Sequence, residues 1–102
     1  MTRGEIWLAQ VGRKTRPVLV LTRPEVIDVR HLVTVAEITT SIRGLATEVD
    51  IDQDDARLEP RSVINCDGLH TVTRASVATF VGAADDDTRG KVCWAVSYAL
   101  GC

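Results

Sequence analysis

The residue types that most often carry enzyme chemistry are present, but they do not form a familiar catalytic or metal-binding pattern. The chain has two histidines, His31 and His70, and neither lies at a metal-ligand spacing from a cysteine or from the other. Its three cysteines, Cys66, Cys93 and Cys102, are odd in number and far apart, which fits neither a disulfide framework nor a metal knuckle. We therefore expect reduced thiols, no metal and no cofactor.

Carboxylates occur in runs, at residues 54–55 and 85–87. Such runs are typical of solvated loops and helix starts, because a catalytic carboxylate needs a pocket that shifts its pKa. The chain contains no glycine-rich phosphate loop and no nucleophile elbow. These residues alone indicate only a small soluble β-rich domain.

Length and composition predict one domain, residues 1–102, with an ordinary globular balance of 45 % hydrophobic and 25 % charged residues. The N-terminus does not resemble a signal peptide, and no segment approaches the roughly 18 to 20 apolar residues of a membrane span. Together with the unpaired cysteines, these features predict a cytoplasmic protein.

Charge is distributed unevenly along the chain, although the net charge is only −2. Residues 1–30 hold six basic side chains against three acidic ones, whereas residues 48–59 hold six acidic side chains against Arg57 alone. A polarised surface can bind a polyanion locally if its basic part clusters in space. A general nucleic-acid coat protein is disfavoured.

Hydrophobic patterning predicts a mainly β protein that ends in a helix. The expected strands are 4–11, 16–22, 32–38, 47–51, 62–66 and 78–82, with a turn at 12–15 and a loop at 52–60. Pro17 must sit at the beginning of its strand or on an edge, since it donates nothing to the ladder. After the acidic start at 85–87, apolar residues recur at helical spacing, and Gly90 weakens the first turn. This pattern predicts a small curled sheet or barrel packed by the terminal helix.

Four segments, in order, resemble MazF/PemK-type endoribonuclease toxins. Residues 4–9 (Gly-Glu-Ile-Trp-Leu-Ala) and 16–21 (Arg-Pro-Val-Leu-Val-Leu) are similar to the family's first two strands. Residues 35–40 (Val-Ala-Glu-Ile-Thr-Thr) resemble its third strand and terminal threonine, and residues 65–72 (Asn-Cys-Asp-Gly-Leu-His-Thr-Val) resemble its Cys-Asp-Gln-x-Arg-Thr-Ile segment. The match covers nearly the whole chain.

The resemblance implies an SH3-like barrel of the kind shared by MazF toxins and CcdB gyrase poisons, acting as a homodimer. It also implies metal-independent, sequence-selective cleavage of single-stranded RNA, in messenger RNA or in structured RNA loops. The expected products carry a 2′,3′-cyclic phosphate and a 5′-hydroxyl, and a cognate antitoxin protein is the expected inhibitor. The family's catalytic arginine corresponds to Arg16 and its catalytic threonine to Thr39.

These two residue types fit the chemistry of such a cleavage. As the ribose 2′-hydroxyl attacks phosphorus, negative charge builds on the non-bridging oxygens. The Arg16 guanidinium can donate two parallel hydrogen bonds to them, and Thr39 adds a neutral hydroxyl. Arginine stays charged, so neither residue explains the proton transfers.

The remaining site residues are expected to contact RNA. Arg13 and Lys14 lie close in sequence to Arg16 and would bind phosphate without reading bases. Asp67 matches an aspartate that some family members use near the substrate, although an Asp-Gly pair also favours a turn. His70 is a candidate proton carrier, but it occupies a position where the family usually has arginine, so we assign it to RNA contact.

This sequence differs from the family pattern at several positions, and these differences limit which family properties can be expected of it. The loop at residues 12–15 is shorter than in the family, and Asn65 and His70 stand where arginine is common. The recognition sequence is therefore not predicted. Two alternatives stay open: a CcdB-like gyrase poison, which the ending Tyr-Ala-Leu-Gly-Cys at 98–102 disfavours, and an inactive RNA-binding module.

Overall fold

The computed structural model describes residues 1–51 and 61–102. In this part of the chain six antiparallel strands form one sheet in the spatial order β4-β5-β3-β2-β1-β6. The strands are β1 (Glu5–Val11), β2 (Lys14–Val20), β3 (Leu32–Thr39), β4 (Glu48–Asp50), β5 (Val63–Thr73) and β6 (Val77–Ala83). The helices are α1 (Pro24–Ile27), the 3-10 turn η1 (Arg74–Ser76) and the C-terminal α3 (Asp86–Leu100).

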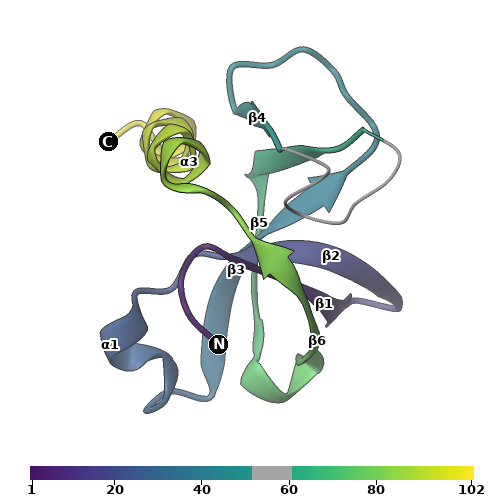
Figure 1. The fold of residues 1–102 in the computed structure, drawn as a ribbon, viewed down its shortest axis with the longest axis vertical. Helices are drawn as coiled ribbons and strands as arrows, with labels where there is room; N and C mark the ends of the chain where they lie inside the picture. The colour runs from purple at the N-terminus through teal and green to yellow at the C-terminus, as the bar shows by residue number, and fades with distance from the viewer. Residues whose placement is uncertain (52–60) are drawn as a thin grey trace.

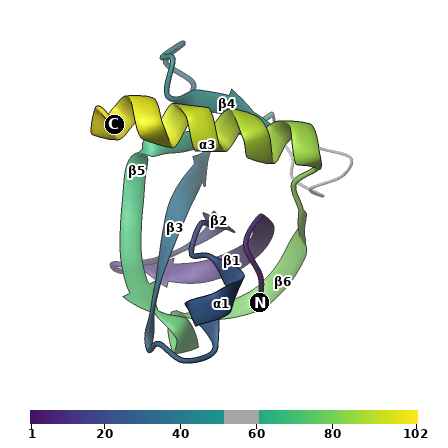
Figure 2. The ribbon, with the colours of Figure 1, turned by 90° about the vertical axis from the view of Figure 1, so that its left-hand side faces the viewer.

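The sheet is strongly curved, so that β1 and β5 touch although two strands separate them (Figure 1). Helix α3 crosses the end of the sheet formed by β4 and β5 (Figure 2). The predicted mainly β fold with a C-terminal helix is confirmed. None of the described helices is long and apolar enough to cross a membrane.

Apolar side chains cover both faces of the central strands. In β3, Ala36 and Ile38 join the core beneath α3, while Val33 and Val35 join a second cluster with Val18 of β2. Alternate residues of a strand point to opposite faces, so the middle of β3 is buried on both sides. This double burial explains why β2 and β3 have nearly continuous apolar sequences.

Strand β5 differs most from the sequence prediction. The sequence predicted a strand ending at residue 66, but β5 continues to Thr73. Its pairing with β3 shifts register between Ala36, which faces Leu69, and Glu37, which faces Asn65. The three residues between these partners form a bulge in a polar stretch, and neither alternation nor an apolar run marks it as a strand.

The short turn before β2 is also tighter than predicted. β2 begins at Lys14 rather than Arg16, and Gly12 turns the chain with a φ of 61°. β3 pairs with β2 only over Val18–Val20, so Pro17 lies where the β3 side of β2 is open. This agrees with its expected edge position. The predicted loop at 52–60 lies outside the described residues.

Helix α3 begins and ends as its sequence indicates. The side chain of Asp85 accepts a hydrogen bond from the Thr88 N–H at 2.8 Å. Hydrogen bonding to the side chain of Thr88, and then to its N–H, lowers the pKa of Asp85. Gly101 ends the helix in the left-handed conformation, with a φ of 73°. The predicted stripe is buried at Val92 and Ala95 but not at Leu100, which is exposed.

All three cysteines are free in the structure. Cys66 lies fully buried in the core beneath α3, whereas Cys93 and Cys102 are exposed. Burial, with a smaller contribution from the negative charge of Asp67, raises the pKa of the Cys66 thiol to about 11. Cys66 therefore stays a protonated core thiol with low reactivity at neutral pH.

Candidate active site

A polar site begins where the second apolar cluster ends. Val33 and Val35 are buried on one face of β3, and the next residues on that face are Glu37 and Thr39. β2 also turns from apolar to polar at this level of the sheet. Val18 of β2 pairs with Glu37, and Arg16 lies two positions before Val18 on the same face of β2. Neighbouring strands thus bring a cation, an anion and a hydroxyl to one edge of the core.

Glu37 joins two of the predicted site residues. Its Oε1 lies 2.9 Å from Arg16 Nη1, and its Oε2 lies 3.3 Å from His70 Nε2. The Glu37 side chain is 21 % exposed, against 35 % for Arg16 and 37 % for His70. A pair this open to solvent adds little stability, so its main effect is to fix the directions of the guanidinium and the imidazole.

Thr39 is the last residue of β3, and its hydroxyl is held in place. Thr39 Oγ1 accepts the Ser41 N–H at 3.0 Å, which leaves the hydroxyl proton available to a ligand. Two hollows meet at this residue. The cationic hollow, of about 440 Å³, includes Lys14, Arg16 and Thr39 in its wall.

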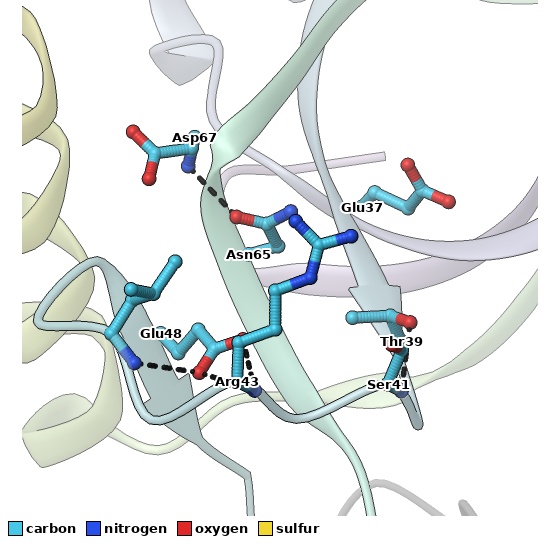
Figure 3. Close-up of a pocket in the computed structure, with 8 residues that line it drawn as sticks. Glu37, Thr39, Ser41, Arg43, Glu48, Asn65 and Asp67 are labelled. Atoms are coloured by element: carbon cyan, nitrogen blue, oxygen red, sulfur yellow. Dashed lines mark hydrogen bonds between the residues drawn. The ribbon is translucent and has the colours of Figure 1, made fainter.

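The second, mixed-charge hollow has a volume of about 200 Å³ (Figure 3). It is lined by Glu37, Thr39, Ser41, Arg43, Leu45, Glu48, Asn65 and Asp67. In Figure 3 the side chain of Arg43 extends across β5 toward Asn65. A single arginine therefore lies over a wall that carries three carboxylates.

The bulge in β5 fixes two polar side chains of this wall. The Asp67 N–H donates to Asn65 Oδ1 at 3.0 Å, and the Thr47 hydroxyl donates to Asp67 Oδ2 at 2.5 Å. A Cβ at Gly68 would lie 2.9 Å from Asn65 Nδ2, so only glycine leaves room for this arrangement. Asp67 and Gly68 thus belong to a bulged strand, and their interpretation as a tight turn is wrong.

The segment that carries Arg43 is held by Glu48. Both oxygens of this carboxylate accept the Arg43 N–H, at 3.1 and 3.0 Å, and Oε1 also accepts the Leu45 N–H at 3.0 Å. The bonds from Leu45 and Arg43 lower the pKa of Glu48. Glu48 thus holds the segment over the mixed-charge hollow.

We expect acid to release this segment. A carboxylate with a lowered folded-state pKa stabilises the fold fully above its unfolded pKa of about 4.3, and the contribution is lost as pH falls through the folded value. Glu48→Gln should therefore flatten part of the decline in Tm below pH 4.5, measured by circular dichroism. Asp87→Asn, at an exposed position in α3, is the matched control. Identical pH profiles for wild type and Glu48→Gln would contradict this assignment.

The structure places most of the predicted site residues together. Arg16, Thr39 and Lys14 line the cationic hollow, Asp67 lines the mixed-charge hollow, and His70 reaches Arg16 through Glu37. Arg13 is exposed in the β1–β2 turn, outside both hollows.

Glu37 and Arg43 are site residues that the sequence did not predict. Glu37 is the one acidic residue of the β-branched segment 32–38, and a charge inside such a strand was the available signal. Arg43 carries no comparable signal, because its position depends on the backbone bonds to Glu48. Within residues 1–51 and 61–102, no cluster of three or more histidine, cysteine or acidic side chains could hold a metal ion.

Comparison with known proteins identifies the family. Residues 2–100 match the family described as PemK-like, MazF-like toxin of type II toxin–antitoxin system. The chain belongs to this family. Probable endoribonuclease MazF5 of Mycobacterium tuberculosis is 36 % identical over 103 residues, covering 98 % of this chain and 93 % of that protein. Endoribonuclease MazF3 of the same species is 44 % identical over 77 residues, covering 76 % and 73 %.

Comparison with solved structures also finds MazF toxins as relatives of this PemK/MazF-family chain. The Mycobacterium tuberculosis toxin MazF-mt6 superposes with a TM-score of 0.89 and 37 % identity, covering 95 % of this chain and 96 % of that one. The resemblance drawn from the four sequence segments is confirmed. The family also favours the ribonuclease interpretation over a gyrase poison.

Proposed function

We propose that this toxin is an endoribonuclease that cleaves single-stranded RNA sequence-selectively, with Arg16 and Thr39 as its catalytic residues. The observation that carries the proposal is that these two residues, on neighbouring strands, line one cationic hollow. The family assignment supports it, because the similar proteins MazF5 and MazF3 are named endoribonucleases.

In the proposed reaction the ribose 2′-hydroxyl attacks the adjacent phosphorus and the bond to the 5′-oxygen breaks. Glu37 holds one edge of the Arg16 guanidinium, and the remaining N–H groups can donate to the non-bridging oxygens as their charge grows. The Thr39 hydroxyl donates a further hydrogen bond, since its oxygen is already fixed by Ser41. The products carry a 2′,3′-cyclic phosphate and a 5′-hydroxyl.

The RNA strand is expected to cross both hollows at Thr39. Lys14 and the nearby Arg13 contact phosphates and contribute salt-dependent affinity, whereas Asp67 in the mixed-charge hollow contacts the RNA beside the cleaved bond. None of these steps requires a metal or a cofactor.

The partners follow from the same site. A type II antitoxin with an acidic segment that folds on binding fits the cationic hollow and would exclude RNA from it. A homodimer and a cytoplasmic location, where messenger RNA and the antitoxin are both present, complete the proposal.

We expect purified protein to cleave single-stranded RNA in the presence of EDTA, because Arg16 and Thr39 supply the charge stabilisation that a metal would otherwise give. Denaturing gels of a defined RNA measure the cleavage. Arg16→Ala and Thr39→Ala proteins, purified in parallel, control for contaminating ribonucleases. Strict dependence on a divalent metal would refute the mechanism, and RNA binding without cleavage would identify an inactive RNA-binding module.

Mapping the RNA ends formed after brief induction in cells would give the recognition sequence. Cleavage at one short motif supports the proposed sequence selectivity. Ends scattered over all sequences would contradict it.

A further inference from the structure

We propose that His70 is the general base of the cleavage reaction and that Glu37 is the residue that positions it. The inference rests on the proposed ribonuclease function and names the proton acceptor that Arg16 and Thr39 do not supply. It changes the assignment of His70 from an RNA contact to a catalytic residue.

Glu37 sets the direction of the His70 imidazole ring. Nε2 of His70 faces Glu37 Oε2 at 3.3 Å, so in the neutral ring the proton resides on Nε2, where it can be donated to the carboxylate. The lone pair is then on Nδ1, on the other side of the ring. The imidazole is partly open to solvent, with 37 % of the His70 side chain exposed.

Arg16 and His70 both contact the carboxylate of Glu37. The two oxygens of Glu37 hold Arg16 and His70 at the same time, so the two side chains are separated by one carboxylate group. Glu37 therefore holds both the guanidinium that would bind the phosphate and the imidazole that would accept the proton of the ribose hydroxyl. Arg16 cannot be the base, because its guanidinium stays protonated.

Two charged side chains of the site lie near His70: Glu37 of β3 contacts the imidazole, and Arg16 of β2 contacts the same carboxylate. When the imidazole takes a proton, a positive charge forms next to the negative charge of Glu37, which stabilises it. A carboxylate behind a histidine orients and supports a catalytic base in the same way in serine hydrolases.

The step balances without a metal or a redox partner. Nδ1 of His70 takes the proton of the 2′-hydroxyl, the 2′-oxygen forms a bond to phosphorus, and the P–O5′ bond breaks. The departing 5′-oxygen takes a proton from a water molecule. The imidazolium then returns its proton to solvent before the next cycle.

His70→Ala is expected to lower kcat by about 100-fold or more, the usual contribution of a general base, with little change in KM. General-base catalysis predicts a wild-type rate that rises with pH and then levels off, and this rise should vanish in the variant. Added imidazole should restore part of the activity. His31→Ala, at the exposed histidine outside the site, is the matched control and should match wild type in both measurements.

Glu37→Gln tests the positioning residue. We expect a lower kcat with little change in KM, because the neutral amide no longer holds the imidazole through a hydrogen bond to a carboxylate. Glu25→Gln, at an exposed position in α1, should leave kcat unchanged. Circular dichroism melting curves identify any variant that has simply lost its fold.

The outcomes separate this inference from the proposed function. A wild-type protein that does not cleave RNA refutes the function. Wild-type cleavage that is lost in Arg16→Ala but keeps its kcat and pH profile in His70→Ala refutes the inference alone. In that case a raised KM for His70→Ala would return the histidine to RNA binding.

Discussion

An alanine at position 16 is expected to lower kcat for RNA cleavage by about 100- to 1,000-fold, the cost of removing one preorganised donor to a developing negative charge. The guanidinium is held at 2.9 Å from Glu37, so its free N–H groups are aimed before the substrate arrives. Substrate affinity should fall much less, because Lys14 in the same hollow continues to attract phosphate. Single-turnover rates on a short RNA, with a separate binding titration, measure the two effects independently.

Two further variants sharpen this result. Arg16→Lys keeps the positive charge but loses the planar fork, so most of the rate loss should remain. Arg30→Ala removes an exposed arginine before β3 and should leave the rate unchanged. An Arg16→Ala protein that folds and cleaves at the wild-type rate would refute the site assignment, whereas full activity in Arg16→Lys would show that charge alone suffices.

The sequence predicts the strands that hold this site because their patterns are local. Continuous apolar residues predict β2 and β3, and the ordered family segments place Arg16 near the start of β2 and Thr39 at the end of β3. The start of the helix is predicted equally well, since Asp85 acts on the backbone groups nearest to it. These features depend on residues that are close in sequence.

The side-chain contacts between strands join residues that are far apart in the sequence, so they could not be predicted from local patterns. Glu37 meets His70 because β5 continues beyond residue 66 and pairs His70 with Val35, the residue two positions before Glu37 on the same face of β3. The sequence prediction ended this strand at residue 66 and so contained no such pairing. The pairing that makes His70 a candidate base is therefore a property of the folded sheet.

Arg43 illustrates the same limit in a loop. Its sequence neighbours are ordinary, and its place over the mixed-charge hollow depends on backbone hydrogen bonds to Glu48, a residue of the next strand. Propensity and periodicity describe strands and helices, but they do not describe which carboxylate a loop amide will find.

A single 2′-deoxy substitution at the cleaved nucleotide is expected to abolish cleavage there. The proposed reaction has only one nucleophile, the 2′-hydroxyl, and the site arranges donors around a phosphate that this neighbouring group attacks. Without the hydroxyl the phosphate can still bind Arg16 and Thr39, so a deoxy-substituted RNA should act as a competitive inhibitor with nearly unchanged affinity. Gel analysis of end-labelled oligonucleotides measures both properties.

A 2′-deoxy substitution at a different nucleotide of the same RNA is the control. A 2′-deoxy residue two nucleotides from the cleaved bond should leave the rate close to that of all-ribose RNA, because it removes no reacting atom. Mass spectrometry of the wild-type product should show a 2′,3′-cyclic phosphate, which only attack by the neighbouring hydroxyl can form. Continued cleavage of the substituted bond would mean that water is the nucleophile. The general base would then have to activate that water, and deprotonation of a ribose hydroxyl by His70 would no longer explain the reaction.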